Sequence, residues 1–277
     1  MAGVRGTEAG TGVPIRLSNV SKTFGEDDDQ PFLALKEFNA DIRAGEFISV
    51  VGPSGCGKST LMLMVAGLLR RSQGDIVVNG KSVTKPITDV GIAFQDHLLL
   101  EFRSAMGNVM LQADIRGLPK KKIEARANEL FEQLRLTQAM NKYPRQLSGG
   151  MRQRVSLVRT LVHDPSLLLM DEPFGALDAL TRLQVRRDLE ALWLRRRPTV
   201  LFITHSVEEA VGLADRIFVM SPSPGEVVEE IKVELARPRP IALGDAPEFG
   251  AYVDRIHRHF ERMGVLHGVD IPVTTEA

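Results

Sequence analysis

Hydrophobic residues in this chain form short continuous runs that alternate with segments of helical spacing. The continuous runs, which are typical of buried strands, lie at 46–51, 90–94, 166–170 and 199–203. Helices are predicted after some of these strands, at 60–67, 180–195 and 206–213. Strands that alternate with helices indicate an α/β domain, so we predict an α/β core.

Other strands are predicted on both sides of this core. Apolar and polar residues alternate in the first of these segments, as expected for a strand with one buried face. The predicted strands lie at 15–20, 32–42, 75–79, 217–220 and 227–233.

The pattern is helical from 104 to 162 and again near the end of the chain. Within 120–134 the apolar residues share one helical face, and they are Ile123, Ala127, Leu130, Phe131 and Leu134. In the helix at 180–195 we expect Leu183, Leu189 and Leu192 to face inward. A last helix is predicted at 249–263.

Composition excludes several classes of protein. Apolar residues make up 43% of the 277 positions, which is enough for a substantial core. Lys plus Arg and Asp plus Glu number 35 each, whereas a nucleic-acid-binding protein would be basic. Cys56 is the only cysteine, which excludes a disulfide framework and fits a cytosolic setting. Because no apolar run approaches the roughly 20 residues that span a bilayer, we expect a soluble chain that reaches a membrane only through a partner.

A glycine-rich motif follows the predicted strand at 46–51. Its residues are Gly52, Pro53, Ser54, Gly55, Cys56, Gly57, Lys58, Ser59 and Thr60. This is a complete G-x-x-x-x-G-K-[ST] pattern, the P-loop. The glycines allow a tight turn, and backbone N–H groups at the start of the next helix form a cradle for phosphate. Lys58 supplies a positive charge for the β- and γ-phosphates, and the Ser59 hydroxyl can ligate Mg²⁺.

Polar side chains also follow three other predicted strands. Asp171 and Glu172 end one strand, His205 follows the next, and Gln95 follows a third. Ligands of α/β sheets bind at the carboxyl ends of the strands, so we expect these side chains to gather near the P-loop. Asp171 can hold Mg²⁺ through water, and Glu172 can orient or deprotonate a water. We predict that His205 senses the γ-phosphate and that the Gln95 amide ligates Mg²⁺.

A second phosphate site is predicted where Ser148, Gly149 and Gly150 open another helix. A serine and two glycines at a helix N-terminus favour an anion. The P-loop already accounts for the phosphates of one ATP, so a second site suggests that two chains share each nucleotide.

Together these motifs resemble the ATP-binding subunit of ABC transporters, over about residues 15–263. The resemblance is carried by GPSGCGKST at 52–60, Gln95, LSGGM at 147–151, LLLMDE at 167–172, FGALD at 174–178 and His205. It implies a P-loop NTPase core with an N-terminal antiparallel β-subdomain and an inserted α-helical subdomain at about 96–162. The ATPase domain would cover 14–263, between a disordered tail at 1–13 and a C-terminal tail at 264–277.

The resemblance also implies a role for each motif residue. Glu172 would be the general base and His205 the γ-phosphate switch, and together with Lys58 they would make up the catalytic set. Phe24 would stack on adenine, and Asp178 would make a contact across a dimer. Gln95 would link the γ-phosphate site to a membrane partner, while Ser148, Gly149 and Gly150 would contact the ATP held by the opposing subunit.

Within the family, residues 143–155 resemble bacterial importers, and 90–108 and 237–260 resemble the nitrate, sulfonate and taurine importer group. Three positions depart from the usual pattern. Met151 stands where Gln is commonest, Phe24 stands where Tyr is commoner, and Glu101 with Phe102 replaces the group's Pro-Trp.

The function implied is ATP hydrolysis that drives uptake of a small solute, with ATP and Mg²⁺ as cofactors. The partners would be a second copy of the chain, two membrane-spanning permease subunits and, indirectly, a solute-binding protein, with no nucleic acid. The chain would lie at the cytoplasmic face of the inner membrane. Two alternatives remain open, namely a soluble ABC-type ATPase that acts on DNA or ribosomes, and the ATPase subunit of an exporter.

Two local expectations complete the analysis. Cys56 lies beside Lys58 and a helix N-terminus, and both features lower the pKa of a thiol, so we predict a reactive thiolate. Residues 95–108 are predicted to form a groove for a helix of the membrane subunit. We expect this groove to expose four large apolar side chains, Leu98, Leu99, Leu100 and Phe102.

Overall fold

Two β-sheets form the framework of the computed structural model, which describes residues 10–175, 177–239 and 246–266. The smaller sheet is antiparallel, with the order β2-β1-β4-β5. Its strands are β1 (Ile15–Phe24), β2 (Phe32–Ile42), β4 (Gln73–Val78) and β5 (Lys81–Ser82). This sheet is the N-terminal antiparallel β-subdomain that the sequence predicted.

The larger sheet carries the core of the fold, with the order β10-β9-β3-β8-β7-β6. All neighbours pair in parallel except β10, which runs antiparallel to β9. Its strands are β3 (Phe47–Val51), β6 (Gly91–Ala93), β7 (Leu167–Asp171), β8 (Thr199–Thr204), β9 (Arg216–Met220) and β10 (Val227–Lys232). The carboxyl ends of β3, β8 and β7 meet at one edge, because Val51 lies opposite Thr204 and Ile203 opposite Asp171.

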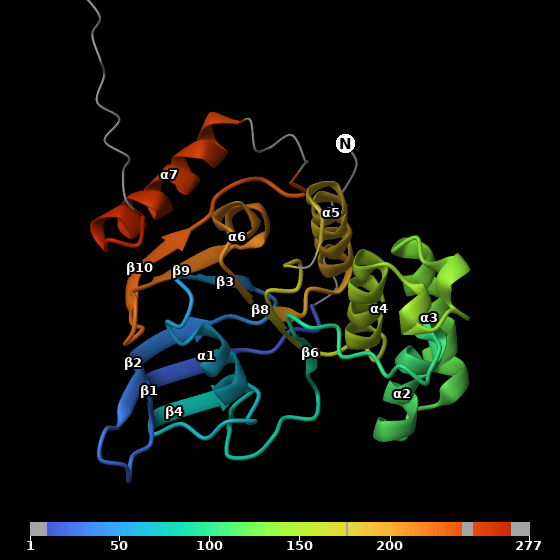
Figure 1. The fold of residues 1–277 in the computed structure, drawn as a ribbon, viewed down its shortest axis with the longest axis horizontal. Helices are drawn as coiled ribbons and strands as arrows, with labels where there is room; N and C mark the ends of the chain where they lie inside the picture. Colours follow the sequence, from blue (N-terminus) through green and yellow to red (C-terminus); the bar gives the residue numbers. More distant parts are fainter. Residues whose placement is uncertain (1–9, 176, 240–245, 267–277) are drawn as a thin grey trace, which may run out of the picture.

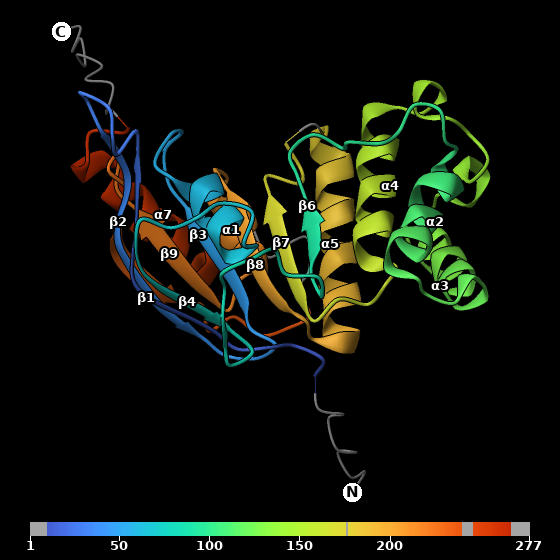
Figure 2. The same ribbon diagram turned by 90° about the horizontal axis from the view of Figure 1, so that it is seen from below.

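Helices cover both faces of this larger sheet (Figure 1). Helix α1 lies between the two sheets, and α5 and α6 lie on the opposite face (Figure 2). The helices are α1 (Lys58–Val65), α2 (Ala105–Arg116), α3 (Lys120–Gln133), α4 (Gly149–Leu161), α5 (Ala179–Arg196), α6 (Val207–Leu213) and α7 (Pro247–Arg262), with 3-10 turns η1 (Thr137–Ala139) and η2 (Pro144–Gln146). Burial on both faces explains why the core strands are continuous apolar runs rather than alternating ones.

A helical unit is inserted between β6 and β7. It contains α2, α3 and α4, which stand beyond the β6 edge of the sheet (Figure 2). Ile123, Ala127, Leu130 and Phe131 of α3 are buried against α2 and α4, as their spacing predicted. The whole arrangement is the α/β P-loop NTPase fold with its helical insertion.

The buried face of α5 differs from the prediction. Its buried apolar residues are Val185, Leu189 and Trp193, while Leu183 and Leu192 are only half-buried. Trp193 determines this orientation, because its ring packs edge-on against Phe47 at 5.6 Å and its indole N–H donates to the Pro198 carbonyl at 2.9 Å. The expectation is confirmed for Leu189 and for Leu192, which is half-buried but packs against the core, and it is wrong for Leu183.

Parts of the two predicted tails lie outside the described residues, namely 1–9 and 267–277. Residues of the first tail that are described make specific contacts. The Thr11 N–H donates to the Arg196 carbonyl at 2.9 Å, and the Thr199 hydroxyl donates to the Val13 carbonyl at 2.6 Å. Within the described ranges, no helix combines the length and the apolar character that crossing a membrane requires.

Candidate functional site

The P-loop joins the end of β3 to the start of α1. Gly55 and Gly57 adopt φ values of 78° and 93°, which L side chains rarely adopt. A Cβ on Gly57 would also lie 2.8 Å from the Ala34 carbonyl oxygen, so the loop requires glycine there. The Lys58 ammonium is buried and donates to the carbonyls of Gly52 and Pro53, each at 2.8 Å. The predicted motif thus forms a folded loop with its one cation at the centre.

Cys56 does not have the reactive thiolate that the sequence predicted. Its side chain is fully buried, and burial raises the pKa of the thiol. The charge of Lys58, whose Nζ lies 3.8 Å from the Cys56 Sγ, lowers this pKa by less than burial raises it. The prediction was wrong because it counted the nearby charge and omitted desolvation.

The carboxylates at the end of β7 lie beside the P-loop. Burial raises the pKa of the Asp171 carboxylate, and the Ser59 hydroxyl, which lies near it, lowers that pKa by less. Glu172 adopts a φ of 44°, a region that residues other than glycine seldom use. Its N–H donates to the Ile203 carbonyl at 2.9 Å, and its Oε2 lies 3.1 Å from His205 Nδ1. The sheet edge therefore brings a hydroxyl, two carboxylates and an imidazole together.

Gln95 reaches the same edge from β6. Its side chain is exposed, and its Nε2 lies 4.0 Å from the position that a Cβ on Gly175 would occupy. Gly175 follows Glu172 closely in the chain, and its N–H donates to the Glu172 carbonyl at 3.1 Å. Gln95 thus lies next to the loop that carries Glu172.

The signature residues and Asp178 occupy a second region. The Ser148 hydroxyl accepts from the Met151 N–H at the start of α4, and the Asp178 carboxylate accepts from the Thr181 N–H at the start of α5. A Cβ on Gly150 would lie 3.3 Å from Thr181, so the two helix starts are neighbours. Helix α4 stands beyond the β6 edge of the sheet, whereas the P-loop follows β3 inside the sheet (Figure 2).

Phe24 ends β1 in the smaller sheet. Its ring is 38% exposed, which leaves a surface on which a flat ring can stack. The Lys22 ammonium lies 5.0 Å from the centre of this ring. The position allows the predicted contact with adenine.

The segment after Gln95 exposes fewer apolar residues than expected. Leu98 and Phe102 are 54% and 75% exposed, but Leu99 is buried and Leu100 half-buried. The Asn108 side chain fixes this loop, because it accepts a hydrogen bond from the Leu100 N–H and donates one to the Leu100 carbonyl. The expectation for Leu99 was therefore wrong, while Leu98 and Phe102 still form an exposed apolar pair.

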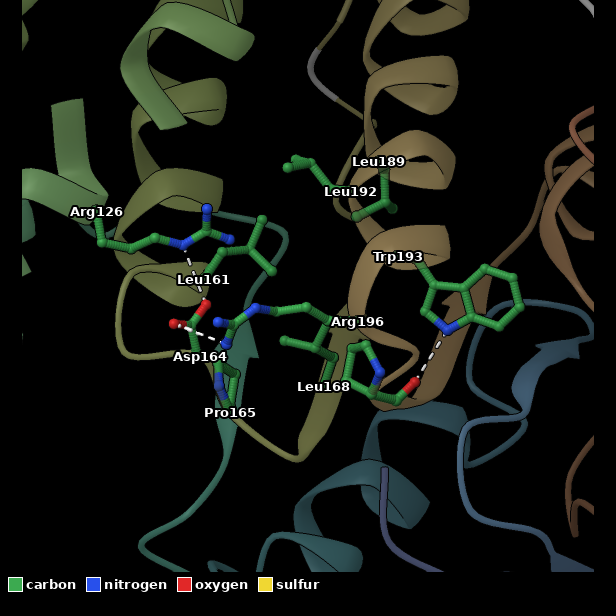
Figure 3. A pocket seen from close by; sticks show the side chains of 10 residues that line it. Arg126, Leu161, Asp164, Pro165, Leu168, Leu189, Leu192, Trp193 and Arg196 are labelled. Carbon is green, nitrogen blue, oxygen red and sulfur yellow. Dashed lines mark hydrogen bonds and ion pairs between the residues drawn. The ribbon is translucent and has the colours of Figure 1, made fainter. Parts of the chain in front are cut away.

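An apolar hollow lies away from these residues, between α3, the end of α4 and α5 (Figure 3). Its volume of about 30 Å³ is close to that of one water molecule rather than of a nucleotide. At its rim Asp164 pairs with Arg126 at 3.0 Å and with Arg196 at 2.8 Å. Through Asp164, these two ion pairs join α3 of the helical unit to α5 of the core.

Sequence reasoning missed Glu209 of α6. Glu208 and Glu209 both follow the helix cap Ser206, in the first turn, where a carboxylate stabilises a helix N-terminus. In the structure Glu208 is exposed, whereas Glu209 is only 6% exposed and accepts from the Thr204 hydroxyl at 2.6 Å. No sequence signal distinguishes the two, because burial here depends on how α5 lies over α6.

Comparison with known proteins gives consistent matches. Residues 35–175 match the family model described as ABC transporter. An uncharacterized ABC transporter ATP-binding protein of Methanocaldococcus jannaschii is 41% identical over 227 residues, which cover 82% of this chain and 85% of that protein. An aliphatic sulfonates import ATP-binding protein of Albidiferax ferrireducens is 45% identical over 250 residues, which cover 90% of this chain and 84% of that protein.

A solved structure extends the match to three dimensions. It is an ATP-binding cassette in a dimeric post-hydrolysis state with bound ADP and Pi, similar to this chain with a TM-score of 0.71 and 30% identity. The alignment covers 80% of this chain and all of that one.

Proposed function

Because this chain belongs to the ABC transporter family, we propose that it is the ATPase subunit of an importer for a small solute of the sulfonate, nitrate or taurine kind. The importer assignment is supported by the name of the relative from Albidiferax ferrireducens, a protein for aliphatic sulfonate import. The observation that carries the chemistry is the contact of Glu172 with His205 at 3.1 Å, at the sheet edge that holds the P-loop.

The side chains at this edge have distinct roles in ATP hydrolysis. The P-loop backbone and Lys58 bind the phosphates, and Lys58 exchanges the carbonyls of Gly52 and Pro53 for phosphate oxygens. Glu172 takes a proton from the attacking water and orients it toward the γ-phosphate. His205 holds the Glu172 carboxylate and responds to the γ-phosphate from its exposed position on the sheet edge.

The residues present fit a magnesium ion. Ser59 and Asp171 offer a hydroxyl and a carboxylate that lie near each other, and Gln95 adds an amide oxygen at the same edge. Oxygen ligands of this kind suit Mg²⁺. Bound there, the ion would neutralise charge on the β- and γ-phosphates.

We place two copies of the chain around each pair of nucleotides. Ser148, Gly149 and Gly150 begin α4, which stands beyond the β6 edge of the sheet, whereas the P-loop of the same chain follows β3 (Figure 2). We infer that they do not complete the site of their own chain. A second copy would present Ser148, Gly149 and Gly150 to that site, with Asp178 beside the junction. The similar cassette solved as a dimer with ADP and Pi supports this arrangement.

The membrane partner would dock on the helical unit, as a permease subunit at the cytoplasmic face of the inner membrane. Leu98 and Phe102 present exposed apolar surface directly after Gln95, which lies at the ATP site. A helix seated there would couple movement of the permease to the γ-phosphate position.

The identity of the solute can be tested with the complete transporter. We would reconstitute the subunit with its permease and solute-binding protein in vesicles and measure ATP hydrolysis with sulfonates, taurine or nitrate. Hydrolysis that rises only when a loaded binding protein is present supports the proposal. Export of solute, or hydrolysis stimulated by DNA or ribosomes, would contradict it.

A further inference from the structure

The buried carboxylate of Glu209 lies behind His205, and none of the ATP-site motifs includes it. We propose that Glu209 is a positioning residue for hydrolysis, which holds His205 in place and ties it to the loop that leads into α5. The inference rests on the proposed role of His205 at the γ-phosphate.

The first contact is with the strand that carries His205. The Thr204 hydroxyl donates to Glu209 Oε2 at 2.6 Å and accepts from the Ser206 N–H at 3.0 Å. His205 is the residue between Thr204 and Ser206, so both of its backbone neighbours are fixed to one hydroxyl. The Thr204 side chain is 1% exposed, and no water competes for these hydrogen bonds at its surface. The orientation of His205 therefore depends on where Glu209 holds that hydroxyl.

The second contact is with α5. Arg182 Nε lies 3.7 Å from Glu209 Oε1, and Arg182 Nη2 donates to the Leu177 carbonyl at 3.0 Å. Among the residues that the structure describes, the Arg182 Nε has no hydrogen-bond partner, and Glu209 is the carboxylate with which Arg182 forms an ion pair. Leu177 directly precedes Asp178, the residue proposed to reach across the dimer. Glu209 thus links His205 to the junction between the two chains.

A buried carboxylate with a purely structural role would be energetically unfavourable at this position. Removing a carboxylate from water disfavours its charged form, and burial raises the pKa of Glu209 accordingly. The hydrogen bond from Thr204 and the charges of Arg182 and Arg186 oppose that shift. An apolar residue of similar volume would fill the space without this cost, whereas only an acceptor can fix the Thr204 hydroxyl and face Arg182 at once.

The test is a pair of double-mutant cycles on the full-length protein. Glu209→Gln keeps the size and an acceptor for Thr204 but removes the charge that faces Arg182. We expect kcat for ATP hydrolysis to fall roughly tenfold, as for other groups that support a catalytic residue, with ATP affinity and Tm close to the parent values. The matched control is Glu208→Gln, because Glu208 is the exposed neighbour on the same helix.

Coupling separates positioning from packing. In a His205→Ala background, measured by single-turnover hydrolysis, Glu209→Gln should cause no further loss, since its partner in the mechanism is gone. Adding Glu209→Gln to an Arg182→Gln protein should likewise cause no further loss of kcat. Additive losses, or a fall in kcat that follows a fall in Tm, would overturn the inference. If the parent protein does not hydrolyse ATP, the proposed function fails; if it does and Glu209→Gln matches it, only the inference fails.

Discussion

Replacing Glu172 by glutamine removes the proposed base with little change of shape. The side chain is mostly buried, with 19% of it exposed, and its Oε2 contacts His205 Nδ1 at 3.1 Å. An amide of the same size can keep a hydrogen bond with the imidazole but cannot accept a proton from water. The Lys58 ammonium donates to the carbonyls of Gly52 and Pro53 within the loop rather than to Glu172. Glu172→Gln should therefore separate hydrolysis from binding.

The size of the effect follows from this separation. A positioned general base contributes about 10²–10⁴-fold to a rate, which corresponds to about 2.7–5.4 kcal/mol of barrier. We expect hydrolysis to fall within that range while the affinity for ATP stays near the parent value. Because bound ATP is then not consumed, two molecules should stay trapped between two chains.

The assay compares three variants with the parent protein, in Mg²⁺ with and without ATP. Hydrolysis is measured by phosphate release, binding with a fluorescent ATP analogue, and assembly by light scattering after size exclusion. Glu172→Gln should run as a dimer with ATP and as a monomer without it. Lys58→Ala should fail to bind ATP and stay monomeric, and Glu124→Gln, an exposed carboxylate on α3, should match the parent in all three measurements.

Two results would refute the reasoning. A Glu172→Gln protein that hydrolyses ATP at the parent rate removes Glu172 from the chemistry. One that binds ATP but stays monomeric at saturating nucleotide contradicts the shared site.

Three further predictions follow from other parts of the structure. Cys56 should resist iodoacetamide in the native state and react fully in guanidinium, because burial raises the pKa of its thiol; rapid labelling of the native protein would contradict this. Phe102→Asp should lower solute uptake per ATP in vesicles, and an unchanged ratio would show that the permease does not dock there. Leu130→Ala removes a fully buried side chain of α3 and should lower the free energy of unfolding by about 2–5 kcal/mol, measured with urea; a loss below about 1 kcal/mol would show that the helical unit tolerates the cavity.

The core of the fold could be predicted because its strands are buried on both faces. The strand at 199–203 is apolar at every position after Thr199, and it is followed by His205, a residue whose type points to phosphate chemistry. Periodicity also placed α3, where the helix has a single buried stripe. Boundaries were less accurate; β1 was predicted to end at residue 20 but continues to Phe24 past an irregularity in its pairing with β2.

The parts that could not be predicted depend on packing between segments far apart in the chain. Leu183 of α5 was expected to face inward but is only half-buried, whereas Trp193 is buried and its ring packs edge-on against Phe47. Cys56 is buried because the chain closes over it; a Cβ on Gly225 would lie 1.9 Å from the Cys56 carbonyl oxygen. Such contacts join residues more than a hundred positions apart, so the pattern of neighbouring residues in the sequence does not predict them.

The insertion of the helical unit has a practical consequence for engineering. The unit leaves the sheet after β6 and returns at β7, and these strands pair with each other at one border of the sheet. The P-loop follows β3, which β8 separates from β7. Because β6 and β7 run parallel, the two junctions of a graft at about residues 96–162 would lie at opposite ends of these strands, the first next to Gln95 and the second before Leu167. Chimeras that exchange this segment, and with it the surface around Phe102, offer a direct way to pair the hydrolytic core with a different permease.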